Sequence, residues 1–173
     1  MRLEEQLVKI SRGSAVHHPH HGIGQVQSIR ERNFEGANGA KFAQLYFQRE
    51  GLTLILPMQD AAQTVRCPIT AKQARQIIKH IETWDGRASK QWKARAAAHQ
   101  EAIDHGDPFE YAEVFKSLSR LEAEGSLRHT DRSHLHRAMD FLADELSFAL
   151  GKTPDAVRDL LTEAAREADP DPV

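Results

Sequence analysis

Residues 67–73, Cys67-Pro68-Ile69-Thr70-Ala71-Lys72-Gln73, separate a part of the sequence with strand patterns from a part with helix patterns. Thr70 followed three residues later by Gln73 is the pattern of a capping box, in which each side chain satisfies a free backbone N–H at the start of a helix. The apolar residues Ile77, Ile78 and Ile81 continue that helix. We therefore expect a domain boundary near residues 66–70.

Short apolar runs before this boundary predict β-strands. Residues 25–30 partly alternate polar and apolar side chains, residues 40–47 are rich in aromatic residues, and residues 52–57 are apolar up to a closing proline. Glycines in residues 35–39 and 49–51 can supply the turns between these runs. Four or five short antiparallel strands this close together predict a small twisted barrel.

The sequence after the boundary predicts helices. Gly106-Asp107-Pro108-Phe109-Glu110 combines a helix end, an N-cap, a proline at the first helical position and an acidic third residue. Thr130 and Thr153 are expected to cap two further helices. Apolar stripes at helical spacing follow these signals and are most simply the core of a bundle. The stripes consist of Tyr111, Val114, Phe115, Leu118 and Leu121, of Leu135, Ala138, Met139, Leu142, Leu146 and Ala149, and of Ala156, Val157, Leu160, Leu161 and Ala164.

These patterns predict an α+β protein with a small N-terminal antiparallel β-barrel followed by an all-α helical bundle. The barrel is expected at residues 15–67 and the bundle at residues 68–168. Residues 1–14 are expected to form a flexible extension and residues 169–173 a flexible tail.

The composition bears on several classes of function. No segment approaches the roughly 18 uninterrupted apolar residues of a membrane span, and residues 1–6 are too polar for a signal peptide, so we expect a cytoplasmic protein. Cys67 is the only cysteine, which leaves no intramolecular disulfide framework and no cysteine-based metal site. Neither a phosphate-cradling loop nor a nucleophile elbow occurs, so we expect no enzyme, no cofactor and no small-molecule substrate.

The segment Arg87-Ala88-Ser89-Lys90-Gln91-Trp92-Lys93-Ala94-Arg95 carries four cations and a tryptophan without any acidic residue. If it is helical, Ser89 is a plausible N-cap and Trp92 projects from the first turn among Lys90, Lys93 and Arg95. Cations can pair with phosphates, and a flat apolar side chain can stack on bases or wedge between them. The pattern predicts nucleic-acid binding by Arg87, Lys90, Trp92, Lys93 and Arg95. The alternative is a solvated face with a packed tryptophan.

The distribution of charge supports a restricted contact surface. Lys and Arg outnumber Asp and Glu by 7 to 4 in residues 70–105, whereas the ratio is 8 to 15 in residues 106–173. A basic patch on a molecule of net charge −2 can offer one face to nucleic acid while the rest repels it.

A histidine cluster, His17-His18-Pro19-His20-His21-Gly22, suggests a metal site, because neutral imidazoles bind zinc and nickel. Its spacing argues against one, since adjacent strand residues point to opposite faces and no nearby carboxylate or thiol pattern completes a site. We predict instead a turn between the first two strands, with no metal bound. A small metal-binding protein remains the alternative.

In their order and spacing, these features resemble the CarD/CdnL family of bacterial transcription regulators, over residues 15 to 164. The resemblance rests on Val16-His17-His18-Pro19-His20-His21-Gly22-Ile23-Gly24, on residues 52–57, and on Trp92 placed fourteen residues before Gly106-Asp107-Pro108. It continues through Ala112-Glu113-Val114, Leu118, residues 138–146 and Ala149-Leu150-Gly151.

The resemblance implies a Tudor-like barrel that binds the β subunit of RNA polymerase by an exposed edge strand, with contacts from Arg32, Thr53 and Ile55. It further implies that Trp92 wedges into promoter DNA at the upstream edge of the melted bubble and stabilises the open complex. The alternative function is a protein-interaction adaptor that binds polymerase or a repair translocase through the barrel without contacting DNA.

Overall fold

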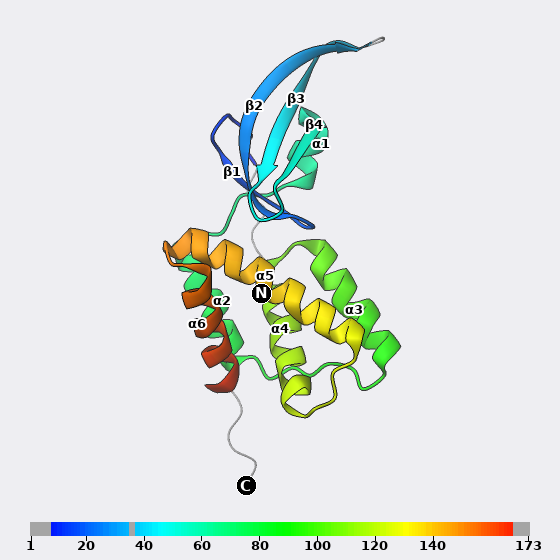
Figure 1. Cartoon of the computed structure of the whole chain (residues 1–173), viewed down its shortest axis with the longest axis vertical. Helices are drawn as coiled ribbons and strands as arrows, with labels where there is room; N and C mark the ends of the chain where they lie inside the picture. The colour runs from blue at the N-terminus through cyan, green and yellow to red at the C-terminus, as the bar shows by residue number, and fades with distance from the viewer. Residues whose placement is uncertain (1–7, 35–36, 168–173) are drawn as a thin grey trace. The chain divides into compact units, whose positions relative to one another are not determined.

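A computed structural model describes residues 8–34 and 37–167, and it confirms the α+β class (Figure 1). These residues contain a four-stranded antiparallel sheet followed by six helices. The chain divides into two units between Pro68 and Ile69. Residues 1–7 of the predicted N-terminal extension and the whole predicted tail, residues 169–173, lie outside the described residues.

The N-terminal unit is a meander whose strands follow one another in the order β1-β2-β3-β4. Its strands are β1 Ala15–His18, β2 Gly22–Phe34, β3 Ala37–Phe47 and β4 Leu52–Pro57. Four or five strands were expected, and the three runs quoted for them form β2, β3 and β4, of which β2 and β3 extend beyond the predicted runs. β2 and β3 remain paired through irregularities in their register, so the two strands stay together over most of their length.

A short helix, α1 Met58–Thr64, follows β4 and was not predicted. After it the chain returns to the first strand, where the His17 N–H donates to the Arg66 carbonyl at 2.8 Å and the Arg66 N–H donates back at 3.0 Å. The sheet and α1 enclose a core of seven buried side chains: Val16, Val26, Ala43, Leu45, Phe47, Ala61 and Val65. Gly24 is required beside this core, since a Cβ there would lie 2.6 Å from the Phe47 ring.

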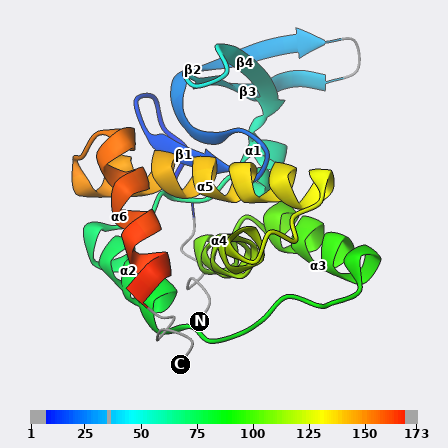
Figure 2. The same ribbon diagram turned by 60° about the horizontal axis from the view of Figure 1, so that its bottom comes forward.

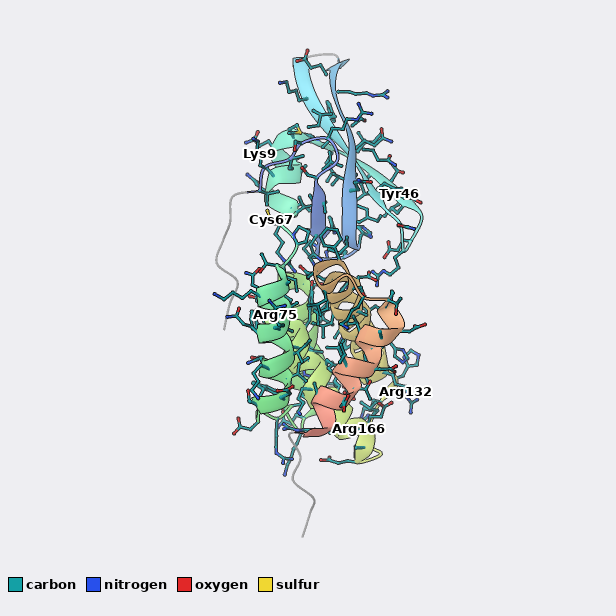
Figure 3. The ribbon with its side chains drawn as sticks, turned by 90° about the vertical axis from the view of Figure 1, so that its left-hand side faces the viewer. Lys9, Tyr46, Cys67, Arg75, Arg132 and Arg166 are labelled. Atoms are coloured by element: carbon teal, nitrogen blue, oxygen red, sulfur yellow. The ribbon has the colours of Figure 1, made fainter. Side chains whose placement is uncertain are left out.

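The C-terminal unit consists of α2 Ala71–Thr83, α3 Trp92–His105, α4 Pro108–Ala123, α5 His129–Leu150 and α6 Pro154–Glu167. Within this unit α4 lies between α2 and α3, and α5 packs across it (Figure 2). Most residues of the predicted apolar stripes form its core, with Tyr111, Leu118 and Leu146 fully buried. Ala156 was expected to face inward but is exposed, because it lies in the first turn of α6. Charged side chains such as Arg75, Arg132 and Arg166 lie on the outside of the unit (Figure 3).

Local capping signals explain where most of these helices begin. Gln73 N–H donates to the Thr70 hydroxyl and Thr70 N–H donates to the Gln73 side chain, so the predicted capping box is confirmed. Asp107 caps α4, as predicted. Thr130 does not cap α5, because the helix already begins at His129 and the Asp131 carboxylate accepts the free N–H of Arg128 at 3.1 Å.

None of the helices in the described ranges combines the length and the apolar character that crossing a membrane requires.

Candidate nucleic-acid interface

The α3 helix begins at Trp92, whose side chain is 41% exposed and is one of the largest exposed apolar groups among the described residues. The expectation that Ser89 caps this helix is wrong, because Gln91 occupies the N-cap position. Ser89 instead turns the chain ahead of the helix, and its hydroxyl accepts the Gln91 N–H at 3.2 Å. Without a side-chain cap, the first N–H groups of α3 remain available, and such groups favour anions.

Two cations lie close to the Trp92 ring. Lys93 Nζ lies 5.6 Å from the ring centroid, and the Arg128 guanidinium carbon lies 5.2 Å from it. Lys90 is exposed on the preceding turn. These four residues, Lys90, Trp92, Lys93 and Arg128, are called the Trp92 surface below. An aromatic ring flanked by cations can interact with a base and with the neighbouring phosphates at the same time.

Sequence reasoning missed Arg128. This residue lies 36 positions after Trp92 in the sequence, immediately before α5, and a lone arginine between two helices carries no local sign of a binding role. Only the packing of α3 against α5 brings its guanidinium to the tryptophan. A mixed apolar and cationic surface is therefore assembled from two separate segments of the chain.

Arg95 is not part of this surface, although the sequence predicted it beside Lys90 and Lys93. Its side chain is 5% exposed and forms a two-fold hydrogen-bonded ion pair with Asp131, at 2.9 and 2.7 Å. This hydrogen bond raises the pKa of Arg95 and lowers the pKa of Asp131. The expected surface position of Arg95 is wrong because helical periodicity places it on the inner stripe of α3, with His99 and Ile103.

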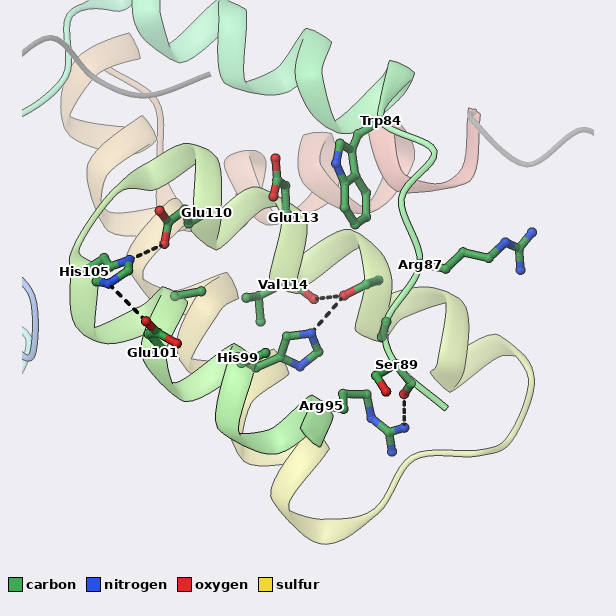
Figure 4. A pocket seen from close by; sticks show the side chains of 14 residues that line it. Trp84, Arg87, Ser89, Arg95, His99, Glu101, His105, Glu110, Glu113 and Val114 are labelled. Atoms are coloured by element: carbon green, nitrogen blue, oxygen red, sulfur yellow. Dashed lines mark hydrogen bonds and ion pairs between the residues drawn. The ribbon is translucent and has the colours of Figure 1, made fainter. Parts of the chain in front are cut away.

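The segment from Trp84 to Gln91, which leads into α3, is held to the bundle by a second arginine. Arg120 on α4 donates to the Gly86 carbonyl at 2.7 Å and to the Trp84 carbonyl at 3.2 Å, and its guanidinium lies 6.0 Å from the Trp84 ring. A Cβ at Gly86 would lie 2.2 Å from that ring, so glycine is needed there. Arg87 follows on the same segment, and its side chain points away from the bundle (Figure 4).

A cavity of about 550 Å³ lies between this segment, α3 and α4, and Figure 4 shows the side chains that line it. At one end of the cavity the His105 imidazole pairs with two carboxylates: its Nδ1 lies 2.9 Å from Glu110 and its Nε2 lies 3.8 Å from Glu101. The wall near the middle is formed by His99, which is 8% exposed. Ser117 also lines this cavity, with 3.4 Å between its Oγ and His99 Nε2.

His99 is held in its neutral form. The Ser117 hydroxyl donates to the Val114 carbonyl at 3.1 Å, so it can only accept from His99 Nε2 at 3.4 Å. His99 Nδ1 is buried and has no hydrogen-bond partner among the described residues, so a proton there would be unsatisfied. Burial, followed by the nearby His134, lowers the pKa of His99 from 6.5 to about 4.

The N-terminal unit presents β4 as an edge strand. Within the described residues β4 pairs with β3 on one side and with no strand on the other. Thr53 and Ile55, both predicted contacts, are exposed on β4, and Ile55 is 46% exposed. Arg32 lies on β2 opposite Ala40, and its side chain is outside the described part of the structure. An exposed edge with an apolar side chain can pair with a strand of another protein.

The histidine cluster forms the predicted turn between β1 and β2. His18 Nδ1 accepts the His20 N–H at 3.0 Å, and His21 Nδ1 lies 2.7 Å from Glu50. Burial and the neighbouring imidazoles lower the pKa of His18 to about 4. In residues 8–34 and 37–167 no group of three or more His, Cys, Asp or Glu side chains is placed to hold a metal ion.

Comparison with known proteins places both units in one family. Residues 76–162 match the model of the CarD C-terminal domain, and residues 10–68 match the model of the CarD-like/TRCF RID domain. The chain is also 25% identical over 147 residues to YdeB of Bacillus subtilis (strain 168), a candidate transcription factor. That alignment covers 84% of this chain and 95% of YdeB.

Proposed function

The chain belongs to the CarD family, and on that premise we propose that it is a transcription regulator that binds RNA polymerase and stabilises the open promoter complex. The N-terminal unit binds the β subunit of the polymerase. The C-terminal unit contacts promoter DNA at the upstream edge of the melted bubble, with Trp92 as the wedge. The polymerase itself selects the promoter, since the Trp92 surface offers few groups that can distinguish bases.

The observation that carries this proposal is the exposed Trp92 with two cations close to its ring. The net binding free energy of an apolar wedge is most favourable where base stacking is already broken, so Trp92 binds a fork better than an intact duplex. Lys90, Lys93 and Arg128 then hold the phosphates beside the inserted ring, and Arg87 adds a fourth cation along the DNA backbone. Preferential binding to open DNA shifts the promoter equilibrium toward the open complex.

The β4 edge supports the polymerase half of the proposal. Its free backbone groups add a strand of the β subunit to the sheet, and Thr53 and Ile55 contact that strand from the outer face. Arg32 contributes a cation from β2. Replacing Ile55 with Glu places a charge among these contacts and is expected to weaken polymerase binding without unfolding the unit, because the side chain is already half-exposed.

The first test measures the lifetime of the open complex with no protein, with wild type, with Trp92→Ala and with Phe148→Ala. Phe148 is the matched control, since it is an aromatic residue that is 54% exposed in the same unit but stands outside the Trp92 surface. Wild type and Phe148→Ala should lengthen the lifetime, and Trp92→Ala should not. Equal lifetimes with wild type and Trp92→Ala would overturn the wedge.

Salt dependence distinguishes this function from that of an adaptor that binds polymerase or a repair translocase without touching DNA. Four phosphate contacts predict that log K for forked DNA falls with log salt at a slope of about −3 to −4. Lys93→Gln or Arg128→Gln should each reduce that slope by about one. A polymerase-binding protein with no measurable affinity for forked DNA would be an adaptor.

A further inference from the structure

The Trp92 surface depends on the relative placement of two chain segments. Lys90, Trp92 and Lys93 come from the start of α3, while Arg128 comes from the start of α5. The Arg128 guanidinium carbon lies 5.2 Å from the centroid of the Trp92 indole, and both side chains are exposed. The contacts that hold the two segments relative to each other therefore bear on this distance.

Arg95 holds the first segment. Its Nη1 donates to the Ser89 carbonyl at 2.8 Å, six residues earlier in the chain, while Nε and Nη2 are bound by Asp131. Because the guanidinium is one planar and rigid group, it can fix the position of the segment before Trp92 relative to α5. Figure 4 shows the contact between Arg95 and Ser89 at the edge of the segment that leads into α3.

Asp131 holds the second segment. Its Oδ2 accepts from Arg95 Nη2 at 2.7 Å and from the Arg128 backbone N–H at 3.1 Å. The carboxylate is 1% exposed, so water competes little for these bonds. One buried carboxylate thus joins the residue before α5, whose side chain lies over Trp92, to the arginine that fixes the start of α3.

We propose that Arg95 and Asp131 are positioning residues, whose ion pair sets the distance between Trp92 and Arg128 and thereby makes the Trp92 surface fit a DNA fork. This inference rests on the proposed function for its consequence in DNA binding. Neither residue touches DNA, because both side chains are buried. Well-packed apolar residues can often replace a buried ion pair without loss of stability. We therefore assign the contribution of this pair to its oriented bonds with Ser89 and Arg128.

The decisive variant is the double substitution Arg95→Met and Asp131→Leu, which replaces the ion pair with apolar side chains of similar size. It removes the bonds to the Ser89 carbonyl and the Arg128 N–H but substitutes none of the four residues of the Trp92 surface. Arg95→Lys is the second variant and keeps the charge, but an ammonium group cannot make both Asp131 oxygen contacts and the Ser89 contact. The control is Arg158→Met with Asp140→Leu, a more exposed ion pair of 2.6 Å in the same unit.

Two measurements test the proposal on folded protein, as judged by thermal unfolding. The first is binding to forked DNA, which we expect to weaken roughly fivefold or more in Arg95→Met/Asp131→Leu and in Arg95→Lys. The second is fluorine NMR of the full chain labelled with fluorotryptophan, with the Trp92 signal identified by its loss in Trp92→Phe. We expect that signal to shift or broaden in both variants and to be unchanged in the control.

An unaltered Trp92 signal in a folded Arg95→Met/Asp131→Leu variant, or in Arg95→Lys should the double variant not fold, would overturn the positioning role. Wild-type affinity for forked DNA and wild-type stability in the double variant would overturn it as well. If the wild type itself does not bind forked DNA, the proposed function fails. The fluorine signal then still decides whether Arg95 and Asp131 position Trp92.

Discussion

Loss of the titratable group in His99→Gln should flatten the dependence of stability on pH. The substitution keeps an N–H donor near the position of His99 Nε2, which faces Ser117, and removes the ring that can take up a proton. In the wild type the folded protein resists this protonation, because Nδ1 is buried and no residue in the described part of the chain is placed to accept its proton.

The size and sign of the effect follow from the two pKa values. Burial lowers the pKa of His99 from 6.5 to about 4 in the folded protein. Below pH 6.5 the unfolded chain therefore binds a proton that the folded chain does not, and stability falls as the pH falls toward 4. One such group can account for up to about 2 kcal/mol of lost stability between about pH 7.5 and about pH 5.

The measurement is urea unfolding at a series of pH values, followed by circular dichroism. His134, whose pKa is also lowered by burial, and His18 act in the same direction, so the wild type should lose more than the contribution of His99. The difference between wild type and His99→Gln isolates that contribution. Ser117→Ala is the control, since it disturbs the same cavity but leaves the imidazole in place. Equal slopes for wild type and His99→Gln across this range would refute the reasoning.

Three substitutions test the packing. Gly24→Ala places a Cβ against the Phe47 ring and should destabilise the N-terminal unit by about 1–3 kcal/mol, measured by urea unfolding. Gly86→Ala collides with the Trp84 ring and should alter tryptophan fluorescence, so an unchanged emission spectrum would contradict the contact. Leu146→Ala removes a fully buried side chain and should cost about 2–5 kcal/mol in thermal unfolding, whereas a loss well below that would indicate a core that collapses around the site.

Local signals in the sequence were sufficient for most of the helical unit. The Thr70 capping box and the Asp107-Pro108 helix start depend on residues three positions apart or fewer, so their geometry is settled within one turn. Apolar stripes at helical spacing likewise identified the buried faces of α4, α5 and α6. The short helix α1 escaped prediction because its seven residues provide too little periodicity to distinguish it from the end of a strand region.

The candidate site was only partly predictable. A run of cations around one tryptophan is visible in the sequence, and Lys90, Trp92 and Lys93 are exposed together. The burial of Arg95 had a signal that could have been used, since Arg95, His99 and Ile103 repeat at intervals of four residues on α3. An arginine on a buried stripe needs an acidic partner, and nothing local indicates that Asp131 supplies it.

By itself, the sequence determined the α+β class, the caps of α2 and α4 and the presence of a basic segment with a tryptophan, because each of these follows from neighbouring residues. The tertiary structure alone decided which cations accompany Trp92. It buried Arg95 against Asp131 and brought Arg128 to the ring, across 36 positions of sequence in each case. The physical reason is that an ion pair or a cation–π contact depends on distance in space, and only helix packing brings such distant residues together.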